Sequence, residues 1–415
     1  MFTRSQKILL AILATVQFNN IVDFMIMMPL NLQLTRVFQI TPHQFGLLVS
    51  SYTFFAAGSG LLSSLFIDRF DRKKFLQIFF FGFSVGTIAC GLSQKYEWLL
   101  FFRCLTGVFG GVLSSLVMAI VSDTFPYERR GTAMGVVMTA FSFASVFGVP
   151  FSLYLAERFD WHAPFYFLGG VSLIVSFLIS RGVPSMKSHM VGRGSHDIWA
   201  GIKLVFHSRQ AQTSLVFLFC LIFGQFVLIP FMSASLVINA GLPEPQLPLI
   251  YITGGLVSIV TGPLVGYWAD KFGKHKVFTF ALLGSIPPMV MISQISHPLP
   301  LFATLTLVAV FFVFMGGRIN PAMALVSASV PATHRGSFMS LTSCVQQLGS
   351  ASASYAVGLF IVTDKTGHLL NYEFAGYLAT FFSFCALFLV YRITAIKTSP
   401  EIIATVPAPV GEMHL

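Results

Sequence analysis

The amino-acid sequence predicts an all-α integral membrane protein, with twelve transmembrane helices in two six-helix bundles related by a pseudo-two-fold axis. Three observations lead to this prediction: an apolar composition, a series of long apolar runs, and an internal repeat. Apolar residue types make up 55% of the 415 residues and charged types only 10%, with a mean hydropathy of +0.79. Soluble domains carry about 25% charged residues, so this composition is typical of a chain with a large lipid-facing surface.

The apolar runs are long enough to cross a bilayer, which requires about 20 mostly apolar residues. Arg4 and Lys7 before the first run resemble the start of a signal peptide. That run continues to about Leu34 without a small-residue cleavage site, so we interpret it as a retained first span. The twelve predicted spans cover 8–34, 44–67, 75–93, 97–122, 131–156, 163–181, 211–239, 246–269, 277–296, 299–330, 336–363 and 373–394.

Positive charge alternates between the loops that join these spans. One side of the predicted membrane carries 19 of the 25 Lys and Arg residues, the other side carries four, and two lie inside spans. By the positive-inside rule the first side is cytoplasmic, which predicts a multi-pass plasma (inner) membrane protein with both termini in the cytoplasm. The net charge of +10 therefore reflects topology, and we expect no nucleic-acid partner.

The chain divides into four predicted parts, an N-terminal bundle over 1–181, a cytoplasmic linker over 182–210, a C-terminal bundle over 211–394 and a cytoplasmic tail over 395–415. The linker is rich in Gly, Ser and basic residues. Its second part, DIWAGIKLVFHSRQ, fits a short amphipathic helix on the membrane surface and an irregular linker equally well.

The sequence contains no motif for catalysis or for cofactor binding. Walker A, HExxH and GxSxG patterns are absent from it, so we predict a protein that is not an enzyme, has no cofactor and is not driven by ATP. The cysteines stand alone in apolar runs, which is typical of buried thiols and gives no metal site. They are Cys90, Cys104, Cys220, Cys344 and Cys385.

The two halves of the chain repeat each other. The loop FPYERRGTAMG after the fourth span matches VPATHRGSFMS after the tenth, and Arg130 and Arg335 correspond at an offset of 205. The loops SLFIDRFDRKK and GYWADKFGKHK, after the second and eighth spans, align Asp68 with Asp270 at an offset of 202. A parallel repeat of this kind is a transporter architecture, with the substrate site between the halves near the midplane.

These loops resemble the major facilitator superfamily, and the resemblance extends over essentially the whole chain. The family's pattern after its second helix is G-x-x-x-D-[RK]-x-G-[RK]-[RK]. The eighth-span loop matches it well, whereas Ser64 and Asp71 replace glycines in the second-span loop. The resemblance implies a gating loop whose Asp68 latches one conformation by accepting hydrogen bonds at a helix N-terminus of the other half, with topology alone as the alternative. The gating-loop residues are Asp68, Arg69, Arg72, Lys73, Gly266, Asp270, Lys271 and Gly273.

Two further motifs extend the resemblance. Arg103 and Gly107 match the family's R-x-x-x-G pattern in the fourth helix. Gly148 and Pro150 in the fifth helix are similar to the antiporter motif of the twelve-span drug/proton antiporters and sugar-efflux permeases, although the glycines that follow there are Phe151 and Ser152. The resemblance therefore favours efflux and leaves the substrate open.

Away from their ends, the predicted spans contain only three charged residues, Asp23, Arg103 and Arg318, and charge at this depth usually has a partner or a function. Asp23 lies about 10 Å below the outer end of the first span, and Arg103 about 9 Å past the start of the fourth. In the family fold both helices line the N-terminal cavity. We predict an Asp23–Arg103 pair that couples protons to transport through the carboxylate; a static ion pair, or no contact, are the alternatives.

Polar residues in several spans are candidates for the substrate cavity. Asn19 shares a helical face with Asp23, and its role is either in the cavity or in helix–helix packing. Arg318 has no acidic partner in the C-terminal spans, so it either extends to the cytoplasmic face or contacts an anionic solute. The full predicted set is Asn19, Asn20, Gln225, Arg318, Asn320, Gln346 and Gln347.

Together these features predict a secondary active transporter that works by alternating access. The function predicted first is proton-coupled efflux of a small drug-like or metabolite solute. The expected partners are the solute, protons and the lipid bilayer, and we expect a monomer. An uptake carrier or uniporter and a lysolipid flippase on the same fold remain alternatives, as does a sensor without transport.

Overall fold

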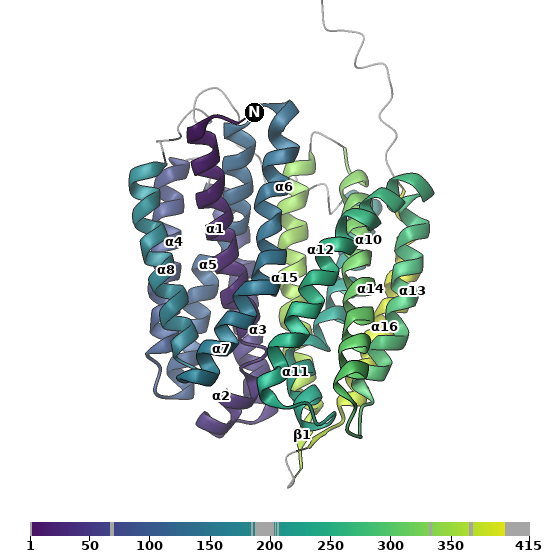
Figure 1. Cartoon of the computed structure of the whole chain (residues 1–415). Helices are drawn as coiled ribbons and strands as arrows, with labels where there is room; N and C mark the ends of the chain where they lie inside the picture. Colours follow the sequence, from purple (N-terminus) through teal and green to yellow (C-terminus); the bar gives the residue numbers. More distant parts are fainter. Residues whose placement is uncertain are drawn as a thin grey trace, which may run out of the picture.

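The computed structural model describes residues 2–66, 70–183, 186, 203, 205, 207–331, 334–364 and 368–394. Two helical bundles stand side by side, one formed by the N-terminal half of the chain and one by the C-terminal half (Figure 1). Within the described residues, twelve long helical segments run between the two ends of the molecule, as the apolar runs predict. The linker over 182–210, with its possible amphipathic helix, lies mostly outside the described residues, and the tail over 395–415 lies wholly outside them.

The first six segments form the N-terminal half, and two of them are interrupted or followed by a shorter helix. Their elements are α1 (Arg4–Ile26), α2 (Asn31–Phe38), α3 (Pro42–Phe66), α4 (Arg72–Gly91), α5 (Tyr96–Thr124), α6 (Tyr127–Phe143), the π-helix η2 (Ala144–Gly148), α7 (Val149–Arg158) and α8 (Ala163–Gly182).

The last six segments form the C-terminal half. Their elements are α10 (Arg209–Phe226), α11 (Ile229–Ile238), the 3-10 helix η4 (Glu244–Gln246), α12 (Leu247–Phe272), α13 (Lys274–Ser293), α14 (Leu301–Ala328), α15 (Arg335–Phe360), β1 (Val362–Thr363), β2 (Leu369–Leu370) and α16 (Tyr372–Val390). The two strands form a short antiparallel hairpin with Val362 opposite Leu370, inside the stretch where the sequence predicts the end of the eleventh span.

Prolines explain why the first and seventh predicted spans are each divided in two. The predicted span 8–34 breaks at a turn over 27–30 that contains Pro29, and the chain resumes there as α2. The predicted span 211–239 breaks before Pro230, which lies in the first turn of α11. Proline has no amide hydrogen and its ring crowds the preceding turn, so the regular helical hydrogen bonds cannot continue through either position.

Eleven of the helical segments in the described residues are long and apolar enough to span a membrane. The remaining long helix, α15, has 26 residues but carries many Ser, Thr, Gln and Gly side chains. It packs along α3 of the other half, where small residues allow close approach. The lower hydropathy of α15 therefore reflects its position between the bundles rather than in lipid.

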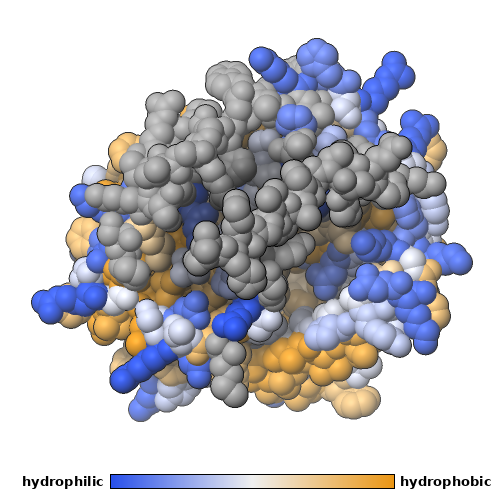
Figure 2. Space-filling model, turned by 90° about the horizontal axis from the view of Figure 1, so that it is seen from above, coloured by the Kyte–Doolittle hydropathy of each residue, from blue (hydrophilic) through white to orange (hydrophobic). Residues whose placement is uncertain are grey.

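The two ends of the molecule differ in charge. The N-terminus lies at the upper end in Figure 1, and hydrophilic residues gather over that end in Figure 2. We call this end the basic face; its exposed residues include Arg4, Lys7, Arg129, Lys271, Arg335 and Arg392. We call the other end, which holds Arg36, Lys95 and Arg158, the opposite face. The described residues thus follow the charge alternation seen in the sequence.

The hydrophobic core shows where the two halves are joined. Near the opposite face, a single cluster of buried side chains includes Leu30 and Phe45 from the N-terminal half and Phe231 and Met232 from the C-terminal half. Near the basic face, each half has clusters of its own among the described residues: one within 9–183, one within 211–393, and a small one of Val265, Ala269 and Val277. The halves are therefore packed together at the opposite face and divided at the basic face.

Backbone contact between α3 and α15 closes the opposite face. A Cβ atom added to Gly46 would lie 2.7 Å from the carbonyl oxygen of Ser354, and one added to Gly358 would lie 3.2 Å from the Cα atom of His43. Glycine is required at both positions for the helices to approach this closely. On the same face Arg36 forms an ion pair with Glu244, which also joins the two halves.

Candidate functional site

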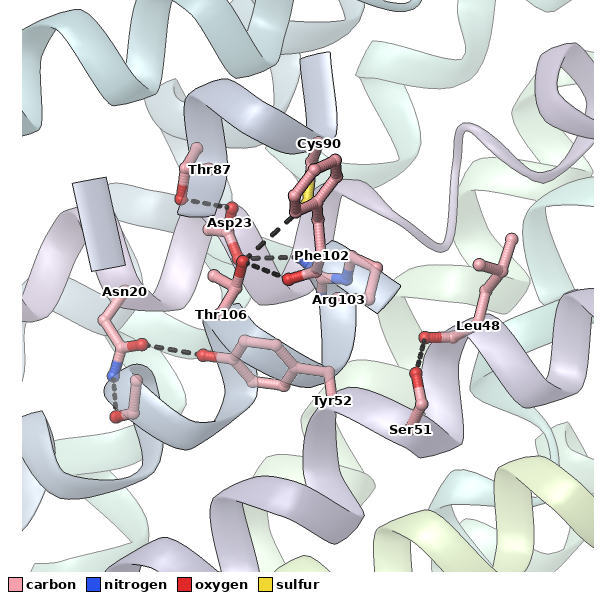
Figure 3. A network of polar contacts seen from close by, with 11 residues as sticks. Asn20, Asp23, Leu48, Ser51, Tyr52, Thr87, Cys90, Phe102, Arg103 and Thr106 are labelled. Carbon is pink, nitrogen blue, oxygen red and sulfur yellow. Dashed lines mark hydrogen bonds and ion pairs between the residues drawn. The ribbon is translucent and has the colours of Figure 1, made fainter. Parts of the chain in front are cut away.

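A buried polar cluster in the N-terminal half contains both residues of the predicted proton-coupling pair. Asp23 on α1 and Arg103 on α5 are fully buried, with 0% of each side chain exposed. Arg103 Nη1 lies 2.8 Å from Asp23 Oδ2 (Figure 3), so the predicted contact between the two charges is present in the structure. A distance of 2.8 Å is typical of a charge-assisted hydrogen bond.

Two further side chains hold this ion pair. Thr87 on α4 donates a hydrogen bond of 3.1 Å to Asp23 Oδ1, so both carboxylate oxygens have a partner. The guanidinium of Arg103 lies over the ring of Tyr52 on α3, 4.4 Å from its centroid. Four helices of the N-terminal half therefore converge on one buried charge pair (Figure 3). Thr87 and Tyr52 are not among the predicted site residues, because neither residue type is unusual in an apolar span.

Arg103 is not fully satisfied by these contacts. Within the described part of the chain, its Nε and Nη2 atoms are buried and have no hydrogen-bond partner. A guanidinium carries five N–H donors and cannot lose its charge in a protein. The pair therefore combines a fixed positive charge with a carboxylate that can be protonated.

Asn20, rather than Asn19, connects α1 to this cluster. Tyr52 donates from its hydroxyl to Asn20 Oδ1 at 2.8 Å (Figure 3), and Asn20 Nδ2 donates to the carbonyl oxygen of Gly110 at 3.3 Å. Asn19 instead donates to the carbonyl oxygen of Thr15 in its own helix. The shared helical face of Asn19 and Asp23 therefore does not bring Asn19 into the cluster, because α3 and α5 contact α1 at Asn20.

Glycines in α5 explain how the aromatic ring reaches the arginine. A Cβ atom on Gly107 would lie 2.4 Å from the carbonyl oxygen of Tyr52, and one on Gly110 would lie 2.4 Å from its hydroxyl oxygen. Gly107 follows Arg103 by one helical turn. The R-x-x-x-G spacing thus has a local physical reason here, since the glycine lets α3 approach and place Tyr52 beside the guanidinium.

Arg318 on α14 lies inside the C-terminal bundle. It is 0% exposed, and its Nη1 atom lies 3.4 Å from the hydroxyl oxygens of both Ser285 on α13 and Ser383 on α16. The side chain therefore does not extend to the cytoplasmic face, one of the two outcomes that the sequence left open. In this conformation it is also shielded from any solute between the halves.

The other predicted cavity residues are more exposed. Asn320 is exposed and donates to the carbonyl oxygen of Gly262 on α12 at 3.4 Å. Gln225 and Gln346 are partly buried, and the Oε1 atom of Gln225 has no partner among the described residues. Gln347 lines a small pocket between the halves on the basic side. The residues lining that pocket are Ala56, Ala57, Gly60, Gly111, Ser115, Ser340, Ser343, Cys344 and Gln347.

The first predicted gating loop is described only in part, since Asp68 and Arg69 lie outside the described residues. Arg72 donates from Nε to Asp123 Oδ2 at 2.9 Å, which ties the start of α4 to the end of α5. Lys73 Nζ donates to the carbonyl oxygen of Ser180 at 2.9 Å. Asp71, which replaces a family glycine, accepts from the backbone N–H of Lys73 and so caps α4.

The second gating loop lies at the basic face between α12 and α13. Asp270 and Lys271 are exposed there, and Gly266 is partly buried. Gly273 adopts a φ of +96°, a conformation that L-residues with a side chain rarely adopt. This turn therefore explains the glycine of the family pattern at position 273.

The fifth-segment motif, which consists of Gly148 and Pro150 in the fifth predicted span, lies where three helices meet. Its glycine, Gly148, ends the π-helix η2, and a Cβ atom added there would lie 2.3 Å from Val22 Cγ2 on α1. Pro150 is in the first turn of α7, where proline is tolerated. A Cβ atom added to Gly255 on α12 would lie 2.5 Å from Val146 Cγ2, so η2 also contacts the C-terminal half.

No group of three or more His, Cys, Asp or Glu side chains in the described ranges is arranged to hold a metal ion. The buried cluster instead places a carboxylate, a group that can carry a proton, beside the fixed charge of a guanidinium.

Comparison with known proteins places this architecture in a family. The sequence model of the Major Facilitator Superfamily matches residues 13–354 and 214–407, which together include most of the chain. The chain belongs to the Major Facilitator Superfamily. It is therefore a multi-pass membrane transporter rather than an enzyme, and a secondary transporter that works by alternating access.

Individual relatives in the superfamily are distant. The chain is 25% identical to the uncharacterized MFS-type transporter YceJ of Bacillus subtilis (strain 168) over 84% of this chain and 88% of the relative. It is 23% identical to a probable sugar efflux transporter of Helicobacter acinonychis (strain Sheeba), over 64% of this chain and 66% of that protein. The substrate of this transporter cannot be transferred from relatives at this distance.

Solved structures confirm the two-bundle, twelve-helix fold. A bacterial homolog of the human lysosomal transporter Spinster, in an inward-facing and occupied conformation, matches with a TM-score of 0.75 and 16% identity, over 95% of this chain and 98% of the other. A D-xylose-proton symporter matches with a TM-score of 0.70 and 18% identity, over 94% and 97% of the two chains. At these identities the likeness concerns the fold alone.

Proposed function

We propose that this Major Facilitator Superfamily transporter exports a small drug-like or metabolite solute in exchange for protons. The observation that carries the proposal is the buried Asp23–Arg103 pair, with 2.8 Å between Nη1 and Oδ2 and no exposure of either side chain. Buried ionisable groups at membrane depth are rare and usually functional, and a carboxylate is the member of this pair that can change charge.

Protonation of Asp23 changes what holds four helices together. The neutral carboxyl group no longer attracts the guanidinium, and breaking a buried pair costs about 3–5 kcal/mol. Arg103 keeps its charge and its contact with the Tyr52 ring at 4.4 Å. A change of this size is sufficient to shift a two-state equilibrium by a factor of about 100 or more. Proton binding therefore favours the conformation in which α1 and α5 can separate.

The conformation observed fits one stage of such a cycle. The halves are joined at the opposite face and have separate cores at the basic face, while the ion pair is formed. We place the basic face in the cytoplasm because the loops there carry most of the positive charge. In this orientation, the arrangement fits an inward-facing stage of the proposed cycle, in which the carboxylate of Asp23 is paired with Arg103. An exporter then binds solute from the cytoplasm.

Relatives include one protein named for multidrug resistance and one named for the transport of niacin. Multidrug resistance protein 3 of Bacillus subtilis (strain 168) is 29% identical over 157 residues, 38% of this chain and 28% of the relative. The niacin transporter NiaP of Acinetobacter baylyi (strain ATCC 33305 / BD413 / ADP1) is 26% identical over 164 residues, 40% of this chain and 37% of that protein. Export is favoured by Gly148 and Pro150 of the fifth-segment motif. The second candidate is proton-coupled uptake that uses the same Asp23–Arg103 pair.

Transport in proteoliposomes tests the coupling. Purified protein is reconstituted with a pH-sensitive dye inside the vesicles, and candidate solutes are screened for solute-dependent proton movement. We expect the wild type to move protons against solute, and Asp23→Asn to transport without any dependence on the pH gradient. The matched control is Asp160→Asn, a change to an exposed aspartate outside the spans. An Asp23→Asn variant with unaltered proton movement would falsify the coupling role.

The direction of proton movement separates export from uptake. Solute added on the cytoplasmic side should release protons into that side if the two move in opposite directions. Protons that accompany the solute in the same direction would instead indicate an uptake symporter, and solute flux without proton movement a uniporter. Flipping of a labelled lysolipid in the same vesicles, without flux of soluble candidates, would indicate the flippase alternative.

A further inference from the structure

The C-terminal bundle contains a completely buried cation, Arg318, that has no counter-charge among the described residues. Arg318 lies on α14, ten residues before the end of the helix, which is about 15 Å from that end. Its side chain points toward α13 and α16, where Nη1 meets the hydroxyl oxygens of Ser285 and Ser383 at 3.4 Å. Both distances exceed the usual 2.9–3.0 Å of an N–H···O bond, so these contacts are weak.

Within the part of the chain that the structure describes, the remaining donors of Arg318 have no acceptor. Among the described residues, its Nε and Nη2 atoms are buried and without a hydrogen-bond partner. Both serine hydroxyls donate to the backbone, Ser285 to the carbonyl oxygen of Leu282 and Ser383 to that of Ala379, each at 2.7 Å. The serines thus offer oxygen lone pairs but no negative charge. Burying a cation in this way is strongly unfavourable unless an anion accompanies it.

No carboxylate of the described C-terminal half is placed to supply that anion. Glu244 forms its ion pair with Arg36 at the opposite face. Asp270 lies near the basic end of α12, and Glu373 lies in the first turn of α16. Asp364 belongs to the hairpin between α15 and α16. All four lie at or near helix ends, whereas Arg318 lies far inside the bundle.

Arg318 also faces away from the junction between the halves. The C-terminal elements that contact the N-terminal half are chiefly α11, α12 and α15, whereas Arg318 lies against α13 and α16. A solute bound between the halves therefore does not reach the guanidinium in this conformation. The missing anion must be small enough to enter the bundle itself.

We propose that Arg318, together with Ser285 and Ser383, binds a small monovalent inorganic anion such as chloride inside the C-terminal bundle. The Nε and Nη2 donors point their hydrogens at the ion, and either serine hydroxyl can rotate from its backbone acceptor to donate as well. The anion neutralises the buried charge and joins α13, α14 and α16. This site is separate from the Asp23–Arg103 pair and does not depend on the solute or on proton coupling.

Thermal unfolding of the purified full-length protein tests the site. Chloride is increased from about 1 mM to about 150 mM in exchange for gluconate at constant ionic strength. We expect the wild-type midpoint temperature to rise by about 2–4 °C, because a ligand of the folded state stabilises it by mass action. Arg318→Gln should show no rise. The matched control, Arg392→Gln, changes an exposed arginine of the same half and should respond like the wild type.

Each of the other outcomes contradicts the proposal. A wild-type midpoint that does not change with chloride, or an Arg318→Gln midpoint that rises equally, excludes an anion site at Arg318. Stabilisation by formate or acetate but by neither chloride nor bromide would assign the site to the carboxylate of a solute instead. If Arg318→Gln does not yield folded protein, the Ser285→Ala/Ser383→Ala double variant takes its place, with a weaker chloride response expected.

A direct measurement is available that needs no variant. Crystals of the wild-type protein grown in bromide should show an anomalous-scattering peak within about 4 Å of the Arg318 guanidinium, at hydrogen-bond distance from its free donors. Bromide replaces chloride with the same charge and a similar radius. Well-ordered density for Arg318 without such a peak would overturn the proposal, whatever the unfolding experiments show.

Discussion

The two halves of this transporter each bury one arginine completely, and the two arginines differ in the groups that contact them. Arg103 in the N-terminal half has Asp23 at 2.8 Å and the ring of Tyr52 at 4.4 Å. Arg318 in the C-terminal half has only two serine hydroxyls at 3.4 Å. The first arrangement contains a group that can be protonated, so it can respond to a pH gradient. The second contains a permanent charge, and under our proposal it responds to an anion instead.

The internal repeat does not account for this difference. At the loop offset of 205, Arg103 corresponds to Val308 and Arg318 corresponds to Leu113, and both of these aliphatic side chains are fully buried. The two arginines therefore occupy different positions in their bundles. A role assigned to one of them cannot be transferred to the other by symmetry, and each has to be tested by itself.

The largest expected effect comes from removing the N-terminal counter-charge. Asp23→Leu leaves Arg103 charged, buried and unpaired, which should lower the free energy of unfolding by about 3–5 kcal/mol. The double variant Asp23→Leu/Arg103→Met removes both charges and should recover most of that loss, while transport stays independent of pH. Thermal unfolding of the wild type, both single variants and the double variant gives the coupling energy. Equal losses in the single and double variants would show that the pair contributes little.

Replacing the buried arginine of the C-terminal half should have a smaller effect on the free energy of unfolding, and one of opposite sign. In chloride-free buffer, Arg318→Met replaces an unpaired buried cation by an apolar side chain. The free energy of unfolding should stay unchanged or rise by up to about 2 kcal/mol. The same measurement on Arg103→Met, which disrupts a formed pair, is the matched comparison and should show a loss. If Arg318→Met lowers the free energy of unfolding as much as Arg103→Met does, Arg318 has a partner comparable to Asp23. The contrast between the halves then disappears.

The difference between the halves can also be removed by adding a carboxylate. Ser383→Asp extends the side chain by one atom toward Arg318 Nη1, which lies 3.4 Å from the present hydroxyl. In chloride-free buffer we expect the free energy of unfolding to rise by about 1.5 kcal/mol, which is the lower end of the range for a hydrogen bond to a charged group. The chloride dependence of the midpoint temperature should disappear at the same time. Ser383→Asn, which adds no charge, should retain it.

Much of the fold follows from the sequence because membrane helices leave strong signals. The apolar runs predict the twelve segments, and the basic loops agree with their alternation. The Asp23–Arg103 contact is also predicted, since two opposite charges at equal depth in neighbouring helices have few other partners. The breaks at Pro29 and Pro230 were missed because the apolar runs continue through both prolines.

The rest of the site depends on which face each helix presents to its neighbours. Thr87 and Tyr52 carry ordinary polar groups, and only the crossing of α3, α4 and α5 brings them to the ion pair. Asn20 joins the cluster in place of Asn19 for the same reason. The direction of Arg318, toward α13 and α16, likewise depends on the rotation of α14 about its axis. A hydropathy pattern does not determine that rotation, since these helices are apolar on most sides.

The smallest effect tests how much the N-terminal pair depends on its neighbours. Thr87→Val keeps the shape of the side chain but removes the hydroxyl that donates to Asp23 Oδ1 at 3.1 Å. We expect the free energy of unfolding to fall by only about 1 kcal/mol, because Arg103 still donates to the other carboxylate oxygen. Ser84→Ala, one turn earlier on α4, is the matched control, since Ser84 is also buried but donates to Phe80. Proton-dependent transport should survive in both variants. If Thr87→Val alone lost the proton dependence of transport, the group of residues that responds to protons would include Thr87. The feature that distinguishes the N-terminal half from the C-terminal half would then be larger than the Asp23–Arg103 pair.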